Sequence, residues 1–276
     1  MLHAVTPIEI PVKQLAWATD LHLGFVVPEL LERAIESFAK APADAFAITG
    51  DISDGRYLEH HLSLLAEAIR KPLFLLLGNH DRYHTSFAEA EKLVKRVILN
   101  HPQMHRLTGK EVIGLSAKTA LLGIDGWADG ESGSGSASPV TLNDMIYIND
   151  LAKLSRAAQW KQIAKWSRAY TETVRPTLER AMGSFEEVIL LTHVPPLPEA
   201  TWHEGQISGP DFLPHFCNAN LGRVIRECCT RHRATRLTVL CGHTHSAGDY
   251  EEENLVIHTA GAIYGSPRVD RAISIP

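Results

Sequence analysis

The sequence predicts an α/β fold in which parallel strands alternate with helices. Over the first hundred residues, short apolar runs alternate with stretches of helical periodicity, in the order strand, helix, strand, helix, strand. Strands joined by helical crossovers pair in parallel, and the helices cover their sheet. The chain of 276 residues is 45% hydrophobic, which is enough for one core. We therefore expect residues 1–276 to form a single domain.

The predicted elements follow the positions of these runs and patterns. Strands are expected at residues 15–19, 45–49, 73–77, 111–115, 119–124, 188–191, 237–241, 255–259 and 269–275. Helices are expected at residues 28–40, 58–70 and 87–95. In the first helix, Leu31, Ile35 and Phe38 share one face, and Pro28 occupies the first turn, where proline is tolerated. The strands beyond residue 110 are expected to form a second group.

A Gly- and Ser-rich stretch at residues 129–139 interrupts this alternation. Its composition is typical of a mobile loop. The stretch follows the end of a predicted strand, together with Asp125, Trp127 and Asp129. It could therefore be either a plain connection or a lid over a functional site.

A helical insertion is predicted at residues 140–183. Its helical pattern covers residues 142–154 and 157–182. Pro176 is expected to be a kink or a boundary, and Gly183 is expected to end the helix. The large aromatic residues of the segment are expected in the core or in an interface; they are Trp160, Trp166 and Tyr170.

Five short polar clusters lie directly after five of the predicted strands. They are Asp20-Leu21-His22, Gly50-Asp51-Ile52-Ser53-Asp54, Gly78-Asn79-His80-Asp81, Thr192-His193 and Gly242-His243-Thr244-His245. Because ligand sites form at the carboxyl ends of parallel strands, these loops should meet in one cleft. Any single Asp could instead be a helix cap, and Asn79 alone could be a turn residue. Four Asp, one Asn and five His in one cleft are hard to explain by packing.

The residue types in these clusters favour transition metals as cofactors. Imidazole and carboxylate donors together suit Mn, Fe or Zn, whereas a mostly carboxylate site would suit Mg or Ca. Two cations about 3.5–4 Å apart can share a bridging carboxylate and act on both sides of a displacement at phosphorus. We therefore expect two divalent or trivalent transition-metal ions, with their identity left open.

The clusters occur in a fixed order that extends from Asp20 to His245. The ordered set Asp-x-His, Gly-Asp-x-x-Asp, Gly-Asn-His-Asp, His and Gly-His-x-His resembles the calcineurin-like metallophosphoesterase superfamily. The resemblance implies two β-sheets packed face to face with helices outside, as a four-layer αββα sandwich. It places one metal on Asp20, His22, Asp51 and His245, and the other on Asp51, Asn79, His193 and His243.

The resemblance also implies an activity and gives roles to residues that bind no metal. His80 would be the catalytic histidine beside the substrate phosphate, Asp81 its orienting partner, and Asp54 a support for a ligand histidine. The implied reaction is hydrolysis of phosphomonoesters or phosphodiesters by a metal-bridging hydroxide, with His80 donating a hydrogen bond or a proton. Small or nucleotide-type substrates are expected.

Two alternatives to this function stay open. The first is a nuclease acting on DNA or RNA, because nucleases share the ligand set. Nuclease relatives usually add further domains, for which little room follows His245. The second is a non-catalytic protein-binding module on the same fold. Such relatives tend to lose ligands or the non-ligand histidine, and all of these residues are present here.

Charge and targeting features limit the partners. The net charge is −5, and the 27 basic residues form no stripe. We therefore expect a small-molecule phosphoester as partner, while nucleic acid is not expected but is not excluded. The segment from Met1 to Pro11 lacks the features of a secretion signal, and no apolar run is long enough to span a membrane. Four cysteines without a Cys-x-x-Cys pair fit a cytoplasmic location. The sequence does not predict the oligomeric state.

A long loop after His193 is expected to pass near the cleft. It carries His203 and His215, either of which could contact a substrate, and Asn220, which could cap the following helix. The remaining histidines are expected at the surface; they include His60, His61, His101, His105 and His232.

Overall fold

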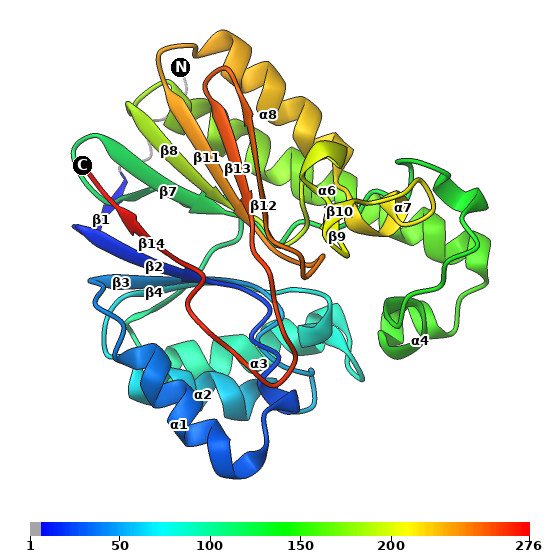
Figure 1. Cartoon of the computed structure of the whole chain (residues 1–276), viewed down its shortest axis with the longest axis horizontal. Helices are drawn as coiled ribbons and strands as arrows, with labels where there is room; N and C mark the ends of the chain where they lie inside the picture. Colours follow the sequence, from blue (N-terminus) through cyan, green and yellow to red (C-terminus); the bar gives the residue numbers. More distant parts are fainter. Residues whose placement is uncertain (1–6) are drawn as a thin grey trace.

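Two β-sheets face each other in the middle of the molecule, and helices cover the outer face of each sheet (Figure 1). The structure is a computed structural model that describes residues 7–276. Residues 1–6 lie outside the described part. They make up about half of the segment from Met1 to Pro11, in which the sequence predicts no secretion signal. The layers confirm the predicted α/β fold with two face-to-face sheets flanked by helices.

The first sheet has five strands. They are β2 (Gln14–Ala18), β3 (Ala45–Thr49), β4 (Leu73–Leu76), β5 (Met104–Arg106) and β14 (Arg271–Ser274). Strands β2 to β5 pair in parallel in chain order, and β14 pairs with β2 in antiparallel orientation. The helices on the outer face are α1 (Pro28–Ala39), α2 (Leu58–Ala68) and α3 (Phe87–Asn100). This half matches the predicted strand–helix alternation.

The second sheet has seven strands. They are β1 (Ile8–Glu9), β6 (Ile113–Gly114), β7 (Thr119–Gly123), β8 (Glu187–Leu191), β11 (Arg236–Cys241), β12 (Gly248–Glu252) and β13 (Leu255–Thr259). Their order is β1-β6-β7-β8-β11-β13-β12, with β7, β8, β11 and β13 in parallel. Its outer helices are α6 (Arg156–Met182) and α8 (Ala219–Arg231), as Figure 1 shows.

Short elements gather beside the carboxyl ends of the second sheet's strands (Figure 1). They are α4 (Asp144–Tyr147), α5 (Asn149–Ala152), α7 (Leu213–Phe216), β9 (Trp202–His203) and β10 (Gln206–Ile207). Single 3₁₀ turns occur at Leu23–Phe25, His80–Arg82, Gly135–Ala137 and Pro198–Ala200. Among the described helices, none combines the length and the apolar character needed to cross a bilayer.

Strand β2 shows how one strand serves two cores. Leu15 and Trp17 pack between the two sheets, whereas Ala16 and Ala18 face the helices α1 to α3. This division follows from the alternation of side chains along a strand. The outer face of the second sheet packs on α6 and α8 in the same way. The strand ends that carry the polar clusters are therefore fixed by apolar packing on both faces.

Most predicted helix ends are confirmed, with two corrections in the insertion. Helix α1 begins at Pro28, and α6 ends at Met182 with Gly183 as its C-cap, as predicted. Helix α6 continues through Pro176, so this proline is not a boundary. The helix predicted at residues 142–154 is wrong, because Ile148 has extended backbone (φ −84°, ψ 119°) and separates α4 from α5.

The Gly- and Ser-rich stretch at residues 129–139 is anchored at several points. The buried Asp129 accepts hydrogen bonds from the backbone N–H groups of Glu131, Ser132 and Ala219. Ser134 donates to the Asp211 carboxylate at 2.6 Å. Among the described residues, none from 125 to 139 lines the cleft over the polar clusters. The structure therefore favours the plain connection over the lid.

Candidate metal centre

All five predicted clusters reach one edge of the paired sheets. Asp20 and His22 follow β2, Asp51 follows β3, Asn79 and His80 follow β4, His193 follows β8, and His243 and His245 follow β11. These strands are parallel within each sheet and end at this edge. The structure thus brings together the seven residues that the sequence predicts as metal ligands. They form two groups that share one carboxylate.

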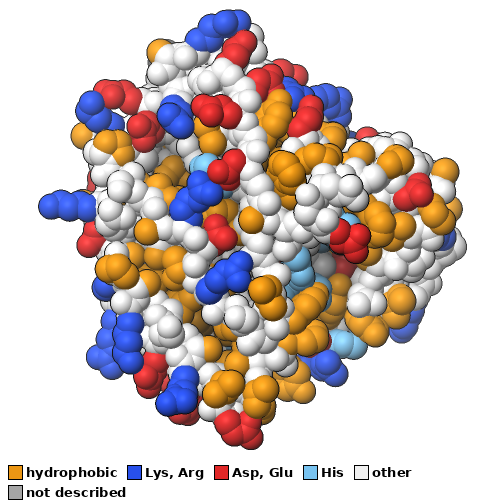
Figure 2. Space-filling view, in the orientation of Figure 1, with side chains coloured by type: hydrophobic (Ala, Val, Ile, Leu, Met, Phe, Trp, Pro, Cys, Tyr) orange, Lys and Arg blue, Asp and Glu red, His pale blue; other side chains and the backbone are white. Residues whose placement is uncertain are grey.

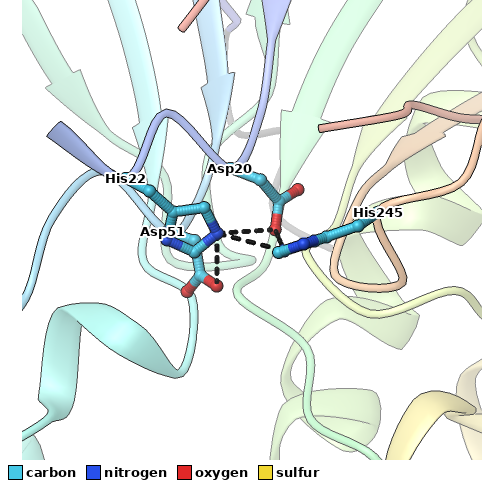
Figure 3. Close-up of side chains that lie close together, drawn as sticks. All are labelled: Asp20, His22, Asp51 and His245. Atoms are coloured by element: carbon cyan, nitrogen blue, oxygen red, sulfur yellow. Dashed lines mark hydrogen bonds and ion pairs between the residues drawn. The ribbon is translucent and has the colours of Figure 1, made fainter. Parts of the chain in front are cut away.

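The first ligand cluster consists of Asp20, His22, Asp51 and His245 (Figure 3). One potential ligand atom from each of these residues lies within 4.8 Å of the others. The Nε2 atoms of His22 and His245 face each other at 3.0 Å. His22 Nε2 lies 3.8 Å from a carboxylate oxygen of Asp20 and 3.8 Å from one of Asp51. Carboxylate and imidazole donors that point at one spot form a ligand set for a divalent transition metal.

The second ligand cluster consists of Asp51, Asn79, His193 and His243. The Oδ1 atom of Asn79 lies 3.0 Å from His193 Nε2 and 3.0 Å from His243 Nδ1. His193 Nε2 is also 3.5 Å from Asp51 Oδ1. Asp51 therefore contributes an oxygen to each cluster, as a bridging carboxylate would.

In the two histidines of the second cluster, the ring nitrogen that faces away from Asn79 contacts a backbone carbonyl, and this contact shows which nitrogen carries the proton. His193 Nδ1 lies 2.8 Å from the carbonyl oxygen of Thr49, and His243 Nε2 lies 3.0 Å from that of His215. A carbonyl only accepts, so each of these nitrogens must donate its proton there. The nitrogens facing Asn79 then carry lone pairs, so four acceptor atoms face one another without a donor between them. A cation satisfies such a group, and backbone carbonyls commonly orient ligand histidines in this way.

The backbone of the ligand loops is left-handed at non-glycine residues. Positive φ angles occur at Asp20 (50°), His22 (44°), Asp51 (52°), His243 (73°) and His245 (61°). This region is uncommon for residues with a Cβ atom and costs on the order of 1–2 kcal/mol per residue. Such conformations concentrate at functional sites, where surrounding structure enforces them. Here they turn five of the seven ligand side chains toward one point.

Two glycines allow the loops to approach each other closely. A Cβ atom on Gly78 would overlap the carboxylate of Asp51, and one on Gly242 would overlap that of Asp20. The glycine of each motif is therefore required by contact with a carboxylate of another loop. This agrees with the close approach expected from the sequence.

The pKa shifts of the residues in the centre also fit the binding of cations. Burial lowers the pKa of His22 to about 4 and that of His193 to about 3, so both are neutral, as metal binding requires. Burial, together with nearby Asp20 and Asp81, raises the pKa of Asp51 well above its usual range. A cation between the clusters would reverse this effect and keep Asp51 ionised. The residues present therefore fit two metal ions.

His80 lies beside both clusters and lines the cleft. Its Nε2 atom is 3.9 Å from an Asp51 carboxylate oxygen, and its ring stacks on Tyr83 at a centroid distance of 4.2 Å. The predicted pairing with Asp81 is wrong. Both carboxylate oxygens of Asp81 accept backbone hydrogen bonds, from Ser53 and from Gly78. Asp81 thus fixes two ligand loops and leaves the ring of His80 to the cleft.

The structure reveals a support for Asn79 that the sequence did not predict. The Asn79 amide nitrogen donates to Asp144 at 2.8 Å, and the Tyr83 hydroxyl donates to the same carboxylate oxygen at 2.7 Å. Because the amide nitrogen is held by Asp144, the amide oxygen faces His193 and His243. Asp144 lies in the insertion, far along the chain from the motifs, so no local signal identifies it. Tyr83 follows the Gly-Asn-His-Asp motif closely and could have been noted.

The clusters form the floor of a cleft of about 340 Å³. Figure 2 shows histidine side chains in a hollow, with hydrophobic and acidic side chains beside them. Aromatic walls come from Tyr83, Phe216 and Tyr264. The Tyr264 ring packs on His22 at a centroid distance of 4.5 Å, and burial raises its pKa to about 12. The cleft size is at the low end for small-molecule sites.

Four other sequence predictions are corrected or refined. Asp54 does not support a ligand histidine; it binds Arg56 and lies 3.6 Å from His84. His61 is buried rather than at the surface, 2.6 Å from the Ser53 hydroxyl. His203 lines the cleft, whereas His215 contributes only its carbonyl group to the centre. The cap of α8 is Asn218, not Asn220.

Comparison with known proteins identifies the family. A family model described as calcineurin-like phosphoesterase matches residues 14–247. The chain belongs to the calcineurin-like phosphoesterase family. It is therefore a phosphoesterase of a family that uses divalent metal ions, and its Asp and His cluster can bind such an ion.

Solved structures match this calcineurin-like phosphoesterase over most of its length. A phosphopantetheinyl hydrolase from Mycobacterium tuberculosis has a TM-score of 0.62 and 15% identity, covering 93% of this chain and 92% of that chain. A 5'-nucleotidase from Candida albicans has a TM-score of 0.46 and 11% identity, covering 93% of this chain and 47% of that chain. No curated protein sequence matches the chain.

Proposed function

We propose that this calcineurin-like phosphoesterase is a two-metal hydrolase of small phosphomonoesters or phosphodiesters. One observation carries the proposal: ligand atoms of two clusters converge on either side of Asp51. In the second cluster, the backbone contacts of His193 and His243 leave only acceptor atoms facing inward. A single metal would leave one of these groups unsatisfied. Two ions, of Mn, Fe or Zn, fit both.

In the proposed reaction, the two ions supply positive charge that activates water and neutralises the phosphoryl oxygens. His80 acts from the side of the cleft. Its Nε2 atom points toward the clusters, so an N–H there can donate to a phosphoryl or leaving-group oxygen. Stacking on Tyr83 holds the ring in this orientation. Asp81 positions the loops at Gly78 and Ser53 and takes no proton from the substrate.

The cleft supports a small substrate. A volume of about 340 Å³ accommodates a phosphate group and a small alcohol part. The solved neighbour named a phosphopantetheinyl hydrolase makes phosphopantetheinyl esters one class for a substrate panel. The nucleotide-type substrates expected from the sequence make another. We also propose a cytoplasmic location, which agrees with the four free and buried cysteines.

The two alternatives have weaker support. A nuclease needs side chains that bind a polyanionic backbone, and neither Lys nor Arg lines the cleft in the described part of the chain. A non-catalytic module has no need for ligand residues held in left-handed backbone.

The proposal is tested by metal analysis together with phosphoester hydrolysis. Purified protein loaded with Mn or Zn should hold two ions per chain and release 4-nitrophenolate from 4-nitrophenyl phosphate or from its diesters. Removal of metal with a chelator should abolish the activity, and adding metal back should restore it. Two bound ions without hydrolysis of any phosphoester would favour the binding module, whereas cleavage of oligonucleotides alone would favour the nuclease.

A further inference from the structure

The cleft above the ligand clusters lacks the positive side chains that usually receive additional phosphate groups. Within residues 7–276, no Lys or Arg lines it, although acidic Asp144 and Glu204 do. Arg82 directly follows the Gly-Asn-His-Asp motif but is fully buried and donates to Asp125 at 2.5 Å. It therefore points into the core. The metal sites and His80 can bind one phosphate, but nothing in the cleft walls neutralises a second anion.

Glu204 is held at the cleft by a tight hairpin. Strands β9 and β10 are joined by Glu204 and Gly205, with φ angles of 50° and 77°. Two contacts attach this hairpin to the ligand loop: His203 Nδ1 lies 3.5 Å from the Thr244 carbonyl oxygen, and Gly205 N–H lies 3.4 Å from Ser246 Oγ. The turn is therefore fixed relative to the second cluster.

The Glu204 carboxylate itself has no partner among the described residues. It makes no hydrogen bond and no ion pair there, so its charge is not compensated within the protein. It repels an anionic group of a substrate and attracts a cationic one. The neighbouring walls are aromatic or apolar: Tyr83, Leu142, Phe216 and Tyr264. Aromatic faces accept apolar groups and cations.

We propose that this site selects phosphoesters whose alcohol part is uncharged or cationic, and that Glu204 is the residue that disfavours alcohol parts with a negative charge. This inference rests on the proposed phosphoesterase function and specifies its substrate class. We therefore expect a higher kcat/KM for single phosphate esters of neutral or amine-bearing alcohols than for nucleoside polyphosphates and bisphosphates.

The test uses three aryl phosphates that differ in the charge of one distant substituent. They are 4-(aminomethyl)phenyl, 4-methylphenyl and 4-(carboxymethyl)phenyl phosphate, or their methyl diesters if the wild type prefers diesters. Release of the phenol is followed for wild type, Glu204→Gln and Glu204→Lys. The control is Glu253→Gln, because Glu253 is also an exposed glutamate in a tight turn (φ 48°) but lies away from the cleft.

The readout is the ratio of kcat/KM for the cationic ester to that for the anionic ester. For wild type we expect a ratio of roughly five to ten, decreasing at high salt, from the interaction of one partly screened charge pair. Glu204→Gln should bring the ratio close to one, Glu204→Lys should reverse it, and Glu253→Gln should leave it at the wild-type value.

The outcomes separate this inference from the function on which it rests. Active protein with the same ratio in wild type and both Glu204 variants would overturn the role of Glu204. Equal changes in Glu204→Gln and Glu253→Gln would overturn it too, because net charge would then be the cause. If metal-loaded wild type hydrolyses neither these esters nor any other phosphoester, the proposed function fails and the inference fails with it.

Discussion

The two ligand clusters share Asp51 but are supported by different parts of the molecule. The first takes its four side chains from loops after β2, β3 and β11, and Asp20 accepts hydrogen bonds from the Thr19 hydroxyl and from the backbone of His243. The second depends on residues beyond these loops, because Asp144 holds Asn79 and the carbonyl of His215 holds His243. The same outlying segments border the cleft. We infer that changes in the cleft wall affect the second cluster more than the first.

The largest effect is expected at Asp51, because both clusters share this residue. Asp51→Asn replaces the shared anion by a weaker, neutral donor, so both clusters should lose affinity. We expect fewer than two metal ions per chain and a loss of kcat/KM of at least about 10⁴-fold. Asp54→Asn, in the same loop but bound to Arg56, is the matched control and should keep both ions. Wild-type metal content in Asp51→Asn, measured by elemental analysis, would rule out the bridge.

A smaller loss is expected at His80, which contacts both clusters and belongs to neither. His80→Ala should keep two metals while kcat falls by roughly 10²–10⁴-fold. The loss should be smaller for 4-nitrophenyl esters, whose leaving group needs little protonation. His84→Ala, an exposed neighbour, provides the control. Loss of one metal in His80→Ala would make His80 a ligand, and equal losses for good and poor leaving groups would indicate phosphate binding instead.

Asp144→Asn tests the asymmetry between the clusters directly. The uncharged amide is a weaker acceptor than the carboxylate and can turn its NH2 group toward the Asn79 and Tyr83 donors, so the Asn79 amide is held less firmly. We expect about 10–100-fold weaker binding of one metal with little change in the other. Metal titration by calorimetry measures both affinities. Asp150→Asn, on the neighbouring turn, is the control. Equal weakening of both metals would contradict the separate support of the clusters.

The smallest effect concerns pH and should be common to both clusters. Burial lowers the pKa of His22 to about 4 and of His193 to about 3 in the folded chain, from 6.5 for an ordinary histidine. The unfolded chain therefore binds more protons below pH 6.5, so stability falls as the pH drops from 6.5 toward 4. The Tm of metal-free protein should decrease over this range.

His193→Gln should make this decrease shallower, because one buried imidazole no longer resists protonation. Calorimetry of metal-free wild type and variant from pH 8 to pH 4 provides the comparison. An identical pH dependence in the two proteins would show that other groups cause it.

The meeting of the seven predicted ligand side chains was predictable because each lies in a short motif directly after an apolar strand. Asp20, Asn79 and His193 needed no knowledge of distant contacts, since parallel strands bring their carboxyl ends to one edge. The fold was predictable for the same reason. Alternation along β2 divides Leu15 and Ala16 between two cores, and that pattern is visible in the sequence.

The supporting residues were not predictable because their partners are distant in the chain. Asp144 is 65 residues from Asn79, and nothing in its neighbourhood distinguishes it from an exposed helix residue. Asp54 and Asp81 were given wrong partners, since a motif shows proximity but not which carboxylate oxygen meets which backbone group. The break at Ile148 depends on its backbone angles and has no marker in composition.

The left-handed backbone of the ligand loops has a consequence for evolution and engineering. Glycine adopts positive φ freely, so replacing His22 or His245 with glycine should relieve conformational cost while deleting a ligand. Selection for stability and selection for catalytic activity therefore oppose each other at these positions. This is a stability–activity trade-off at single residues. A designer who wants a robust, inactive scaffold that keeps the cleft for substrate capture would begin with these residues.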